Sequence, residues 1–237
     1  YITLTHNGNN SICDSSGAEK PKWNGLSPFG IDVVGEMNRL GMIIDVSHIS
    51  DKAFSDVLKH SNAPVLASHS CARAICNVPR NLTDDMIKAL AKKGGLIHLN
   101  FYGAFLDPVY KKKSDEARKI IKPKLDELRE KFKDDRVKLI NAWKALWKKH
   151  GPEIPKMSIL MDHIDHIVKL VGPDHVGFGS DYDGAGGFPE GRKDVYGFPM
   201  ITYHMLKRGY SETDIKKILG GNFLRFFEKV EKKRQSK

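Results

Sequence analysis

Short, mostly apolar runs alternate with stretches of helical periodicity along most of the chain. Each run is four or five residues long, which is typical of strands that are buried on both faces of a parallel sheet. Amphipathic segments separate most of these runs, so the order of elements predicts an α/β fold. The predicted strands cover residues 1–5, 42–46, 64–67, 96–100 and 176–179.

Small polar residues that can cap a first helical turn mark the predicted helix starts. Ser27 stands before Pro28, a residue that fits the first helical position, and Gly41 ends that helix. Five such starts are predicted, and a sixth helix begins near residue 222. The predicted N-caps are Ser27, Ser50, Thr83, Ser158 and Ser211.

Residues 107–157 interrupt this alternation and form a predicted insertion. Apolar side chains recur there at helical spacing, which predicts one or two amphipathic helices. The stripe consists of Ile121, Leu125, Leu128, Phe132, Ile140, Trp143 and Trp147. We therefore expect one α/β domain over residues 1–237 with a helical insertion within it.

The positive charge of the protein is concentrated in this insertion. The 237 residues carry a net charge of +10, and residues 111–149 alone hold fifteen basic and seven acidic side chains. Three interpretations are open: a solvated helix face, a surface for an anionic partner, or a helix that lies on a membrane surface. No nucleic-acid-binding motif accompanies the charge, so nucleic acid is not an expected partner.

Composition excludes two further classes of protein. A hydrophobic fraction of 40% beside 29% charged residues is typical of a folded globular chain, not of a disordered one. No apolar run reaches the roughly 18 residues that a membrane-spanning helix needs.

Cys13, Cys71 and Cys76 match no zinc-finger spacing. Free thiols are the favoured state, and a disulfide between two of them is the alternative.

A polar side chain stands at the carboxyl end of each predicted strand. Active sites of parallel α/β proteins form at this edge, and in (β/α)8 barrels they do so almost without exception. Because hydrogen bonds between strands hold the strand ends in place, we expect these side chains to converge. They are His6, His48, His69, Asn100 and Asp181.

Two imidazoles at the ends of consecutive strands, His48 and His69, indicate a metal site, because neutral imidazole nitrogens ligate zinc. The alternative is a structural role for each. Asp181 lies in GFGSDYDG, where its carboxylate can ligate a metal, steer a water or hold a substrate ammonium; capping the next loop is its alternative. His163 and His166 fall on a predicted outer helix and are assigned to packing or surface roles.

Ten short motifs occur in an order that resembles the renal, or membrane, dipeptidase family of zinc enzymes. They cover nearly the whole chain apart from the insertion. In chain order they are YITLTH, GLSPFG, MNRLG, IDVSHIS, PVLASHS, RN, LNFY, DHIDHI, VGFGSDYDG and GGNFLRFFE. The resemblance implies an α/β fold of the (β/α)8 TIM-barrel type, a site for two zinc ions, and dipeptides as substrates.

The resemblance also implies roles for individual residues. His48 and His69 match the two histidines that ligate one of the zinc ions, and Arg80 matches the arginine that binds the terminal carboxylate of the substrate. His6 matches a histidine that helps polarise the scissile carbonyl. Asp181 matches an aspartate that binds the substrate amine and carries protons. The expected activity is zinc-dependent hydrolysis of dipeptides through a metal-bridged hydroxide, with His6 and Asp181 as catalytic residues.

Two features of the family pattern have no counterpart in this sequence: the HxD pair of the first strand and the metal-bridging glutamate of the third. We therefore expect Tyr1 to open the fourth strand, so that the chain supplies about strands 4–8 of the barrel. The isolated chain is expected to bind zinc poorly and to be inactive.

Two rival functions follow from the same residues. A related metal-dependent amide or lactam hydrolase would differ only in its substrate pocket, and a non-catalytic binding protein would keep the scaffold without the metal. A homodimer is a further expectation. The resemblance suggests a periplasmic, extracellular or membrane-associated location, whereas the sequence itself gives no compartment.

Overall fold

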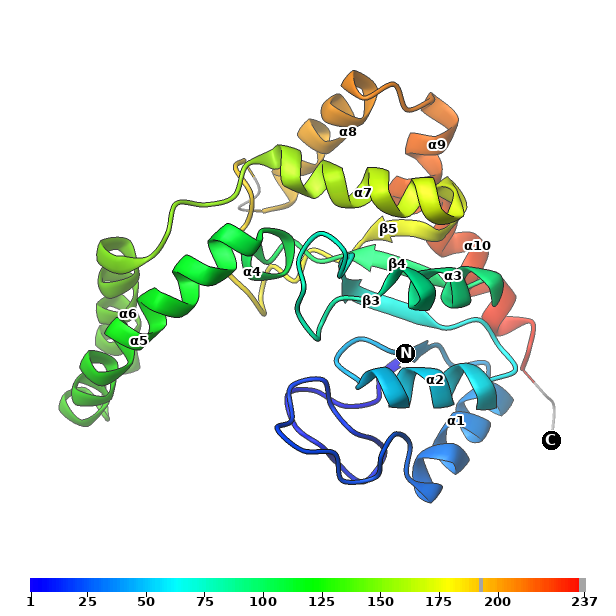
Figure 1. Ribbon diagram of the computed structural model, residues 1–237, viewed down its shortest axis with the longest axis horizontal. Helices are drawn as coiled ribbons and strands as arrows, with labels where there is room; N and C mark the ends of the chain where they lie inside the picture. Colours follow the sequence, from blue (N-terminus) through cyan, green and yellow to red (C-terminus); the bar gives the residue numbers. More distant parts are fainter. Residues whose placement is uncertain (192–193, 235–237) are drawn as a thin grey trace.

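The computed structural model describes residues 1–191 and 194–234, and a five-stranded sheet forms its centre (Figure 1). The strands lie in the sheet in chain order, and each pairs in parallel with the next. This confirms the predicted α/β class, and it is the arrangement of consecutive units in a (β/α)8 barrel. The strands are β1 (Ile2–Thr3), β2 (Ile44–Asp45), β3 (Leu66–Ser70), β4 (Leu96–Leu99) and β5 (Val176–Phe178).

Four amphipathic helices cover one face of this sheet. Their apolar side chains form the main core together with alternate strand residues such as Ile97 and Leu99. The predicted caps Ser27, Ser50 and Thr83 each accept a hydrogen bond from a backbone N–H of the first turn. The helices are α1 (Pro28–Leu40), α2 (Asp51–His60), α3 (Asp84–Lys92) and α7 (Met157–Val171).

The predicted N-cap Ser158 is wrong. Helix α7 begins at Met157, and Lys156 occupies the N-cap position without a side-chain hydrogen bond. Met157 and Leu160 are buried in the main core, so tertiary packing stabilises this first turn in place of a cap. Helix α8 (Phe198–Lys207) is not among the predicted helices, because it also begins without a capping side chain.

The last helix, α10 (Asn222–Glu231), lies against the opposite face of the sheet. Its Phe226 and Val230 form a second, smaller core with apolar strand residues that point away from the main core. Ser211 caps α9 (Glu212–Lys216), as predicted, and the π-helical segment η3 (Lys217–Gly221) joins α9 to α10. The short elements α4 (Gly103–Leu106), η1 (Pro173–His175) and η2 (Val195–Gly197) lie in connecting segments.

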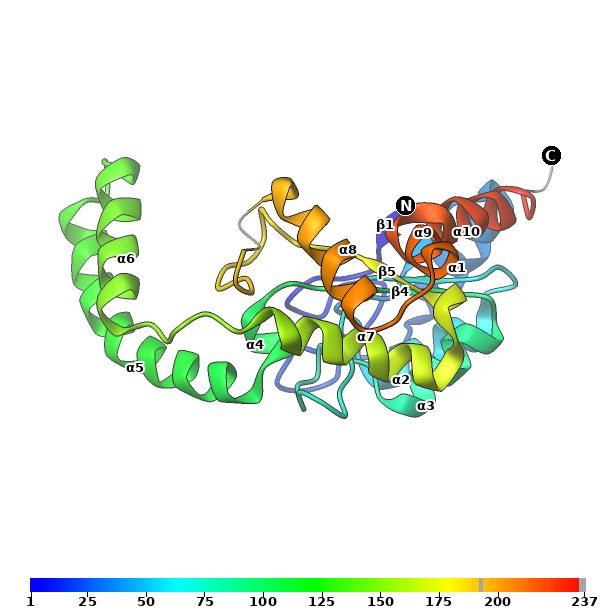
Figure 2. The same ribbon diagram turned by 90° about the horizontal axis from the view of Figure 1, so that it is seen from above.

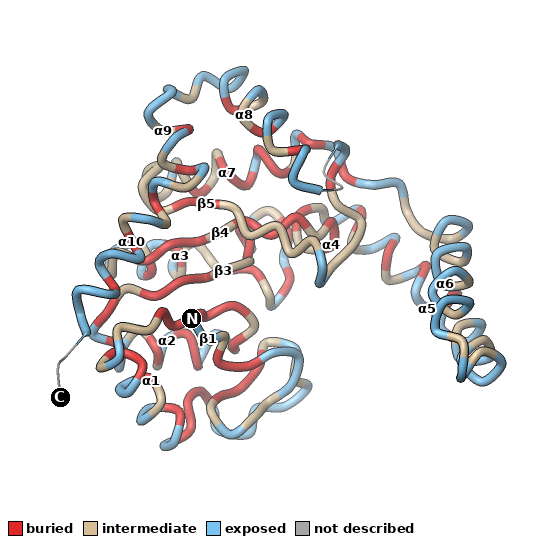
Figure 3. The backbone as a smooth tube through the Cα atoms, turned by 180° about the vertical axis from the view of Figure 1, so that it is seen from behind, coloured by how far each residue is buried: buried red, intermediate tan, exposed pale blue. Residues whose placement is uncertain are grey.

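Two helices, α5 (Pro108–Lys131) and α6 (Arg136–His150), form an antiparallel hairpin that stands away from the sheet (Figures 1 and 2). We call residues 108–150 the arm. Helix α5 buries residues such as Tyr110 and Ile121 near the body, whereas α6 has no buried residue, and the tube of Figure 3 is exposed or intermediate there. The arm is therefore held mainly through α5.

The state of the thiols agrees with the favoured prediction: Cys13, Cys71 and Cys76 are all buried and free. Among the described helices, none is both long enough and apolar enough to cross a bilayer.

Candidate metal and substrate site

Three histidines from three neighbouring strand ends meet at the carboxyl edge of the sheet. The ring centroids of His6 and His48 are 4.4 Å apart, and those of His48 and His69 are 4.9 Å apart. The Nε2 atoms of His48 and His69 approach to 2.8 Å. Both imidazoles therefore direct the same ring nitrogen to one place, which is the arrangement that shared coordination of a cation requires.

The backbone at two of the site residues adopts a conformation that side chains disfavour. His48 has φ 72° and Asp181 has φ 60°, and in the described part of the chain only Asn24 joins them as a non-glycine residue with positive φ. Such strain persists only where the surrounding structure holds it, and it is concentrated at functional sites. The backbone conformation therefore indicates a functional site at His48 and Asp181, independently of what their side chains can bind.

A completely buried carboxylate, Asp45, lies beneath the histidines. Its Oδ1 accepts hydrogen bonds from the backbone N–H groups of Ser47 (3.0 Å) and Ser68 (2.9 Å). Its Oδ2 accepts from the hydroxyls of Thr3 and Ser68, both at 2.6 Å. Asp45 is not among the sequence-predicted site residues; the available signal was a lone acid within the apolar run 42–46.

A β-bulge shapes the second histidine strand. The register between β3 and β4 shifts between Ala67 and Ser70, so Ser68 and His69 lie in an irregular stretch of strand. Bulges redirect side chains and are common next to active sites. The bulge allows the neighbouring side chains of Ser68 and His69 to contact each other, with 2.7 Å between Ser68 Oγ and His69 Nδ1.

Arg80 places a cation beside the histidines. Its Nη2 donates to the backbone carbonyl of His69 at 3.1 Å, and its guanidinium lies 5.4 Å from the centroid of the Phe105 ring. The Nε atom is buried and has no hydrogen-bond partner. An unpaired N–H donor of a guanidinium is suited to an anionic ligand, because burying it without an acceptor is costly.

The last strand brings Asp181 to the same edge. Asn100, which follows β4, donates from Nδ2 to Asp181 Oδ2 at 3.1 Å, and its Oδ1 accepts from the backbone N–H of Tyr102 at 2.6 Å. The Asp181 carboxylate is close enough to oppose, by its charge, the lowering of the His69 pKa. The structure thus joins Asn100 and Asp181 to the histidine cluster.

Burial and positive neighbours keep the two imidazoles neutral. Desolvation, followed by the charge of Arg80, lowers the pKa of His48 to about 3, and the same two causes lower the pKa of His69. Burial also lowers the pKa of Arg80 to about 10, which leaves it charged at neutral pH. A neutral imidazole keeps one ring nitrogen with a lone pair, which is the form that can ligate a metal.

The two histidines on helix α7, His163 and His166, do not join this site. His163 is buried between α7 and the body, where its Nδ1 accepts from the backbone N–H of Ala72 and its Nε2 lies 2.9 Å from the carbonyl oxygen of Leu106. His166 pairs with Asp84 at 2.8 Å. The packing and surface roles predicted for both histidines are confirmed. Within residues 1–191 and 194–234, no three His, Cys, Asp or Glu side chains are placed to hold a metal together.

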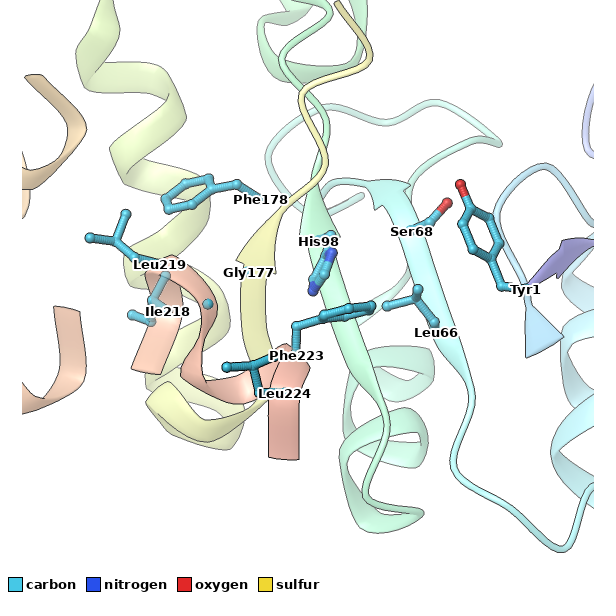
Figure 4. Close-up of a pocket in the computed structure, with 11 residues that line it drawn as sticks. Tyr1, Leu66, Ser68, His98, Gly177, Phe178, Ile218, Leu219, Phe223 and Leu224 are labelled. Carbon is cyan, nitrogen blue, oxygen red and sulfur yellow. The ribbon is translucent and has the colours of Figure 1, made fainter. Parts of the chain in front are cut away.

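A separate cavity lies elsewhere on the sheet. It has a volume of about 500 Å³ and is lined by Tyr1, His98 and Phe223 among others (Figure 4). Of the residues described for the candidate site, only Ser68 lines this cavity. We therefore place the candidate site at the histidine cluster, where the charged groups converge, and not in this mostly apolar cavity.

Comparison with known proteins identifies the family. The family model for membrane dipeptidase, peptidase family M19, matches residues 1–237. Dipeptidase tcpJ from Claviceps purpurea is 36% identical over 231 residues, which cover 98% of this chain and 44% of that protein. The chain belongs to the membrane dipeptidase family, as its motifs predict.

Solved structures give the same result. The probable dipeptidase PvdM from Pseudomonas aeruginosa matches with a TM-score of 0.77 and 35% identity, over 95% of this chain and 61% of that one. A metallo peptidase from Rhodobacter sphaeroides, liganded with a phosphinate mimic of the dipeptide L-Ala-D-Ala, matches with a TM-score of 0.67 and 29% identity over 87% of this chain and 48% of that one. The chain spans about half the length of the curated relatives it matches.

Proposed function

We propose that the whole protein is a zinc-dependent dipeptidase and that this chain supplies one half of its active site. The observation that carries the proposal is the approach of His48 Nε2 and His69 Nε2 to 2.8 Å, beside a buried arginine and a strand-end aspartate. Family membership supports the reaction class, and the dipeptide mimic bound by the Rhodobacter sphaeroides relative supports the substrate class.

The donor set fits a zinc ion. His48 and His69 bring the Nε2 atoms of two imidazoles together at 2.8 Å, and zinc prefers such nitrogen ligands. Two histidines do not complete a catalytic zinc site, which normally has three protein ligands. We propose that the remaining ligands, and those for a second ion, come from a part of the protein outside this chain.

When bound, zinc would polarise the scissile carbonyl and activate a water for attack on it. The residues of this chain would hold the substrate in place for that attack. The Arg80 guanidinium would bind the terminal carboxylate, since its buried Nε–H has no acceptor among the described residues. The imidazole of His6, which is exposed beside His48, would hydrogen-bond the carbonyl oxygen as negative charge develops on it.

Asp181 would act at the other end of the substrate. Asn100 holds its Oδ2, so Oδ1 is the oxygen that remains to accept a hydrogen bond from the substrate ammonium. The same carboxylate would receive the proton of the attacking water and pass it to the leaving amine. Because Arg80 and Asp181 would each bind one charged end, the site is expected to accept peptides of two residues and to reject longer ones.

The proposal is tested on the complete protein with a panel of matched substrates. A dipeptide, its N-acetyl form, a tripeptide, an N-acyl amino acid and a lactam would be compared at equal concentration. We expect hydrolysis of the dipeptide with a kcat/KM at least about 100-fold above that for the tripeptide and the N-acetyl dipeptide, because each of these loses one charge-assisted contact. Equal rates on the dipeptide and tripeptide, or preferential turnover of the lactam or N-acyl amino acid, would contradict it.

A further inference from the structure

The hydrogen bonds around Asp45 have only one consistent direction. Asp45 is fully buried, and its carboxylate is surrounded by four donors: two backbone N–H groups and the hydroxyls of Thr3 and Ser68. A carboxylate can only accept hydrogen bonds. The single hydroxyl proton of Ser68, 2.6 Å from Oδ2, therefore points toward Asp45, since otherwise two sets of lone pairs would face each other at this distance.

That direction fixes the next hydrogen bond. Ser68 Oγ lies 2.7 Å from His69 Nδ1, and with its own proton directed to Asp45 it can only accept there. His69 must then carry its proton on Nδ1, which leaves a lone pair on Nε2. The same lone pair faces His48 Nε2 at 2.8 Å and accepts a hydrogen bond from His48 Nε2–H when no cation is present.

We propose that Asp45 and Ser68 are positioning residues that hold His69 in the Nδ1–H tautomer, so that its Nε2 is free to ligate a metal. This inference rests on the proposed function for its purpose, but the tautomer itself is a property of this chain. Partners of this kind fix the tautomer and the ring orientation of metal-binding histidines. Here the carboxylate acts through a hydroxyl, because the bulge in β3 places Ser68 between Asp45 and the ring.

We call the hydrogen-bonded series Asp45–Ser68–His69 the relay. It makes an unusual prediction for an isosteric substitution of Asp45. In Asp45→Asn, the amide nitrogen can replace Oδ2 and donate to Ser68 Oγ. Ser68 would then turn its proton toward His69 Nδ1, and the ring proton would move to Nε2, where it blocks metal binding. The substitution therefore reverses the tautomer of His69 without removing any atom from the contact.

Nitrogen-15 NMR of the full chain without metal tests this directly, since protonated and bare ring nitrogens have distinct chemical shifts. The His69 signals would be assigned by their loss in His69→Gln. We expect Nδ1–H in the unmodified chain and in Ser68→Thr, which keeps the hydroxyl, and Nε2–H in Asp45→Asn. Thr3→Val is the matched control, because it removes another hydrogen bond to the same carboxylate oxygen but leaves the relay intact. It should retain Nδ1–H.

Several results would overturn the relay. It fails if the unmodified chain carries Nε2–H at His69, if Asp45→Asn keeps the Nδ1–H tautomer, or if Thr3→Val changes the tautomer as Asp45→Asn does. Ser68→Ala gives an independent measurement should Asp45→Asn not fold. It removes the acceptor of the Nδ1 proton, so a mixture of both tautomers is expected, and an unchanged pure Nδ1–H signal would contradict the relay.

Titration with zinc alone separates this inference from the proposed function. If both hold, Asp45→Asn and Ser68→Ala weaken zinc binding about 10- to 100-fold, whereas Thr3→Val does not. Zinc binding that is unaffected by His48→Ala and His69→Ala would refute the metal role of these histidines and leave the tautomer result standing. Zinc binding that depends on both histidines but is unchanged in Asp45→Asn would refute the relay instead.

Discussion

The carboxyl edge of the sheet and the arm are both rich in polar side chains, but they use them in opposite ways. At the edge, Asp45 is removed from water, Ser68 and His69 are half-buried, and the polar groups of all three are bonded to one another. In the arm, most charged side chains are solvated, and α6 exposes apolar ones such as Trp143, which is 42% exposed. Burial, more than composition, distinguishes the two regions.

The difference follows from what holds each region in place. The edge is held by four strand pairings and by helices packed on the sheet, so its side chains are fixed in place, and burial lowers the pKa of His48 there. The arm helix α6 contacts mainly α5, and it can tolerate changes that the edge cannot. We therefore expect substitutions to affect catalysis at the edge, stability in the main core, and neither strongly in the arm.

The largest effect is expected at the proposed metal ligands. In the complete protein, His69→Ala should lower kcat/KM for a dipeptide by about 10³-fold or more, because the activation of water by the metal is lost. Lys144→Ala in the arm is the control and should leave kcat/KM unchanged. Steady-state kinetics with measured zinc content would check this, and a His69→Ala enzyme with full zinc and near-normal activity would contradict the proposed site.

Replacing an isoleucine should lower the free energy of unfolding much more in the main core than in the arm. Ile164 is fully buried in α7, and replacing it with Ala should lower the free energy of unfolding by about 3 kcal/mol or more through transfer and cavity terms. Ile140 in α6 is 41% exposed, and Ile140→Ala should change it by no more than about 0.5 kcal/mol. Urea denaturation measures both, and equal losses would show that the arm is packed as tightly as the core.

Buried His163 should make the body sensitive to acid. Burial lowers its pKa to about 4, below the value of about 6.5 for an unfolded histidine, so the folded state favours the neutral ring. The resulting stability is fully present above pH 6.5 and is lost as the pH falls toward 4, by about 3 kcal/mol. Protonation at Nδ1 would also displace the backbone N–H of Ala72.

Unfolding in urea at pH 7 and pH 4.5 measures this loss. His163→Gln, which cannot be protonated, should be less stable at pH 7 but should lose less stability on acidification than the unmodified chain. His60→Gln is the control, because His60 is exposed and should leave the pH dependence as it is. An unchanged acid sensitivity in His163→Gln would assign the effect to other groups.

Substrate recognition should depend on the shape of one guanidinium. Arg80→Lys keeps the positive charge but loses the forked donor pair, so kcat/KM for a dipeptide should fall about 30-fold in the complete protein, corresponding to about 2 kcal/mol. Arg208→Lys is the matched control: Arg208, at the end of α8, binds Asp162 and Asp165 of α7 through its two Nη atoms. A similar loss in both variants would indicate a general effect on folding instead of carboxylate recognition.

Local sequence signals predicted which strand ends carry the site residues, but not the hydrogen bonds that hold those residues in place. Strand ends and N-caps depend on a few neighbouring residues, so His48, His69 and the cap Thr83 could be located from the sequence. The role of Asp45 could not, because it depends on a register shift between β3 and β4 and on Ser68, twenty-three positions away. The start of α7 at Met157 was missed for the same reason: core packing, which is not local, determines it.

The smallest effect is expected at the exposed aromatic pair of the arm. Trp143 and Trp147 stack with their ring centroids 6.0 Å apart, on a helix without a buried residue. Trp143→Ala removes this contact and should lower the free energy of unfolding by about 1 kcal/mol or less, with no change in kcat/KM of the complete protein. Urea denaturation and dipeptide kinetics on the same preparation measure the two quantities. A loss of activity at unchanged stability would contradict this separation of arm and site. It would mean that Trp143, which lies on the arm, affects catalysis at the carboxyl edge of the sheet through the body of the protein.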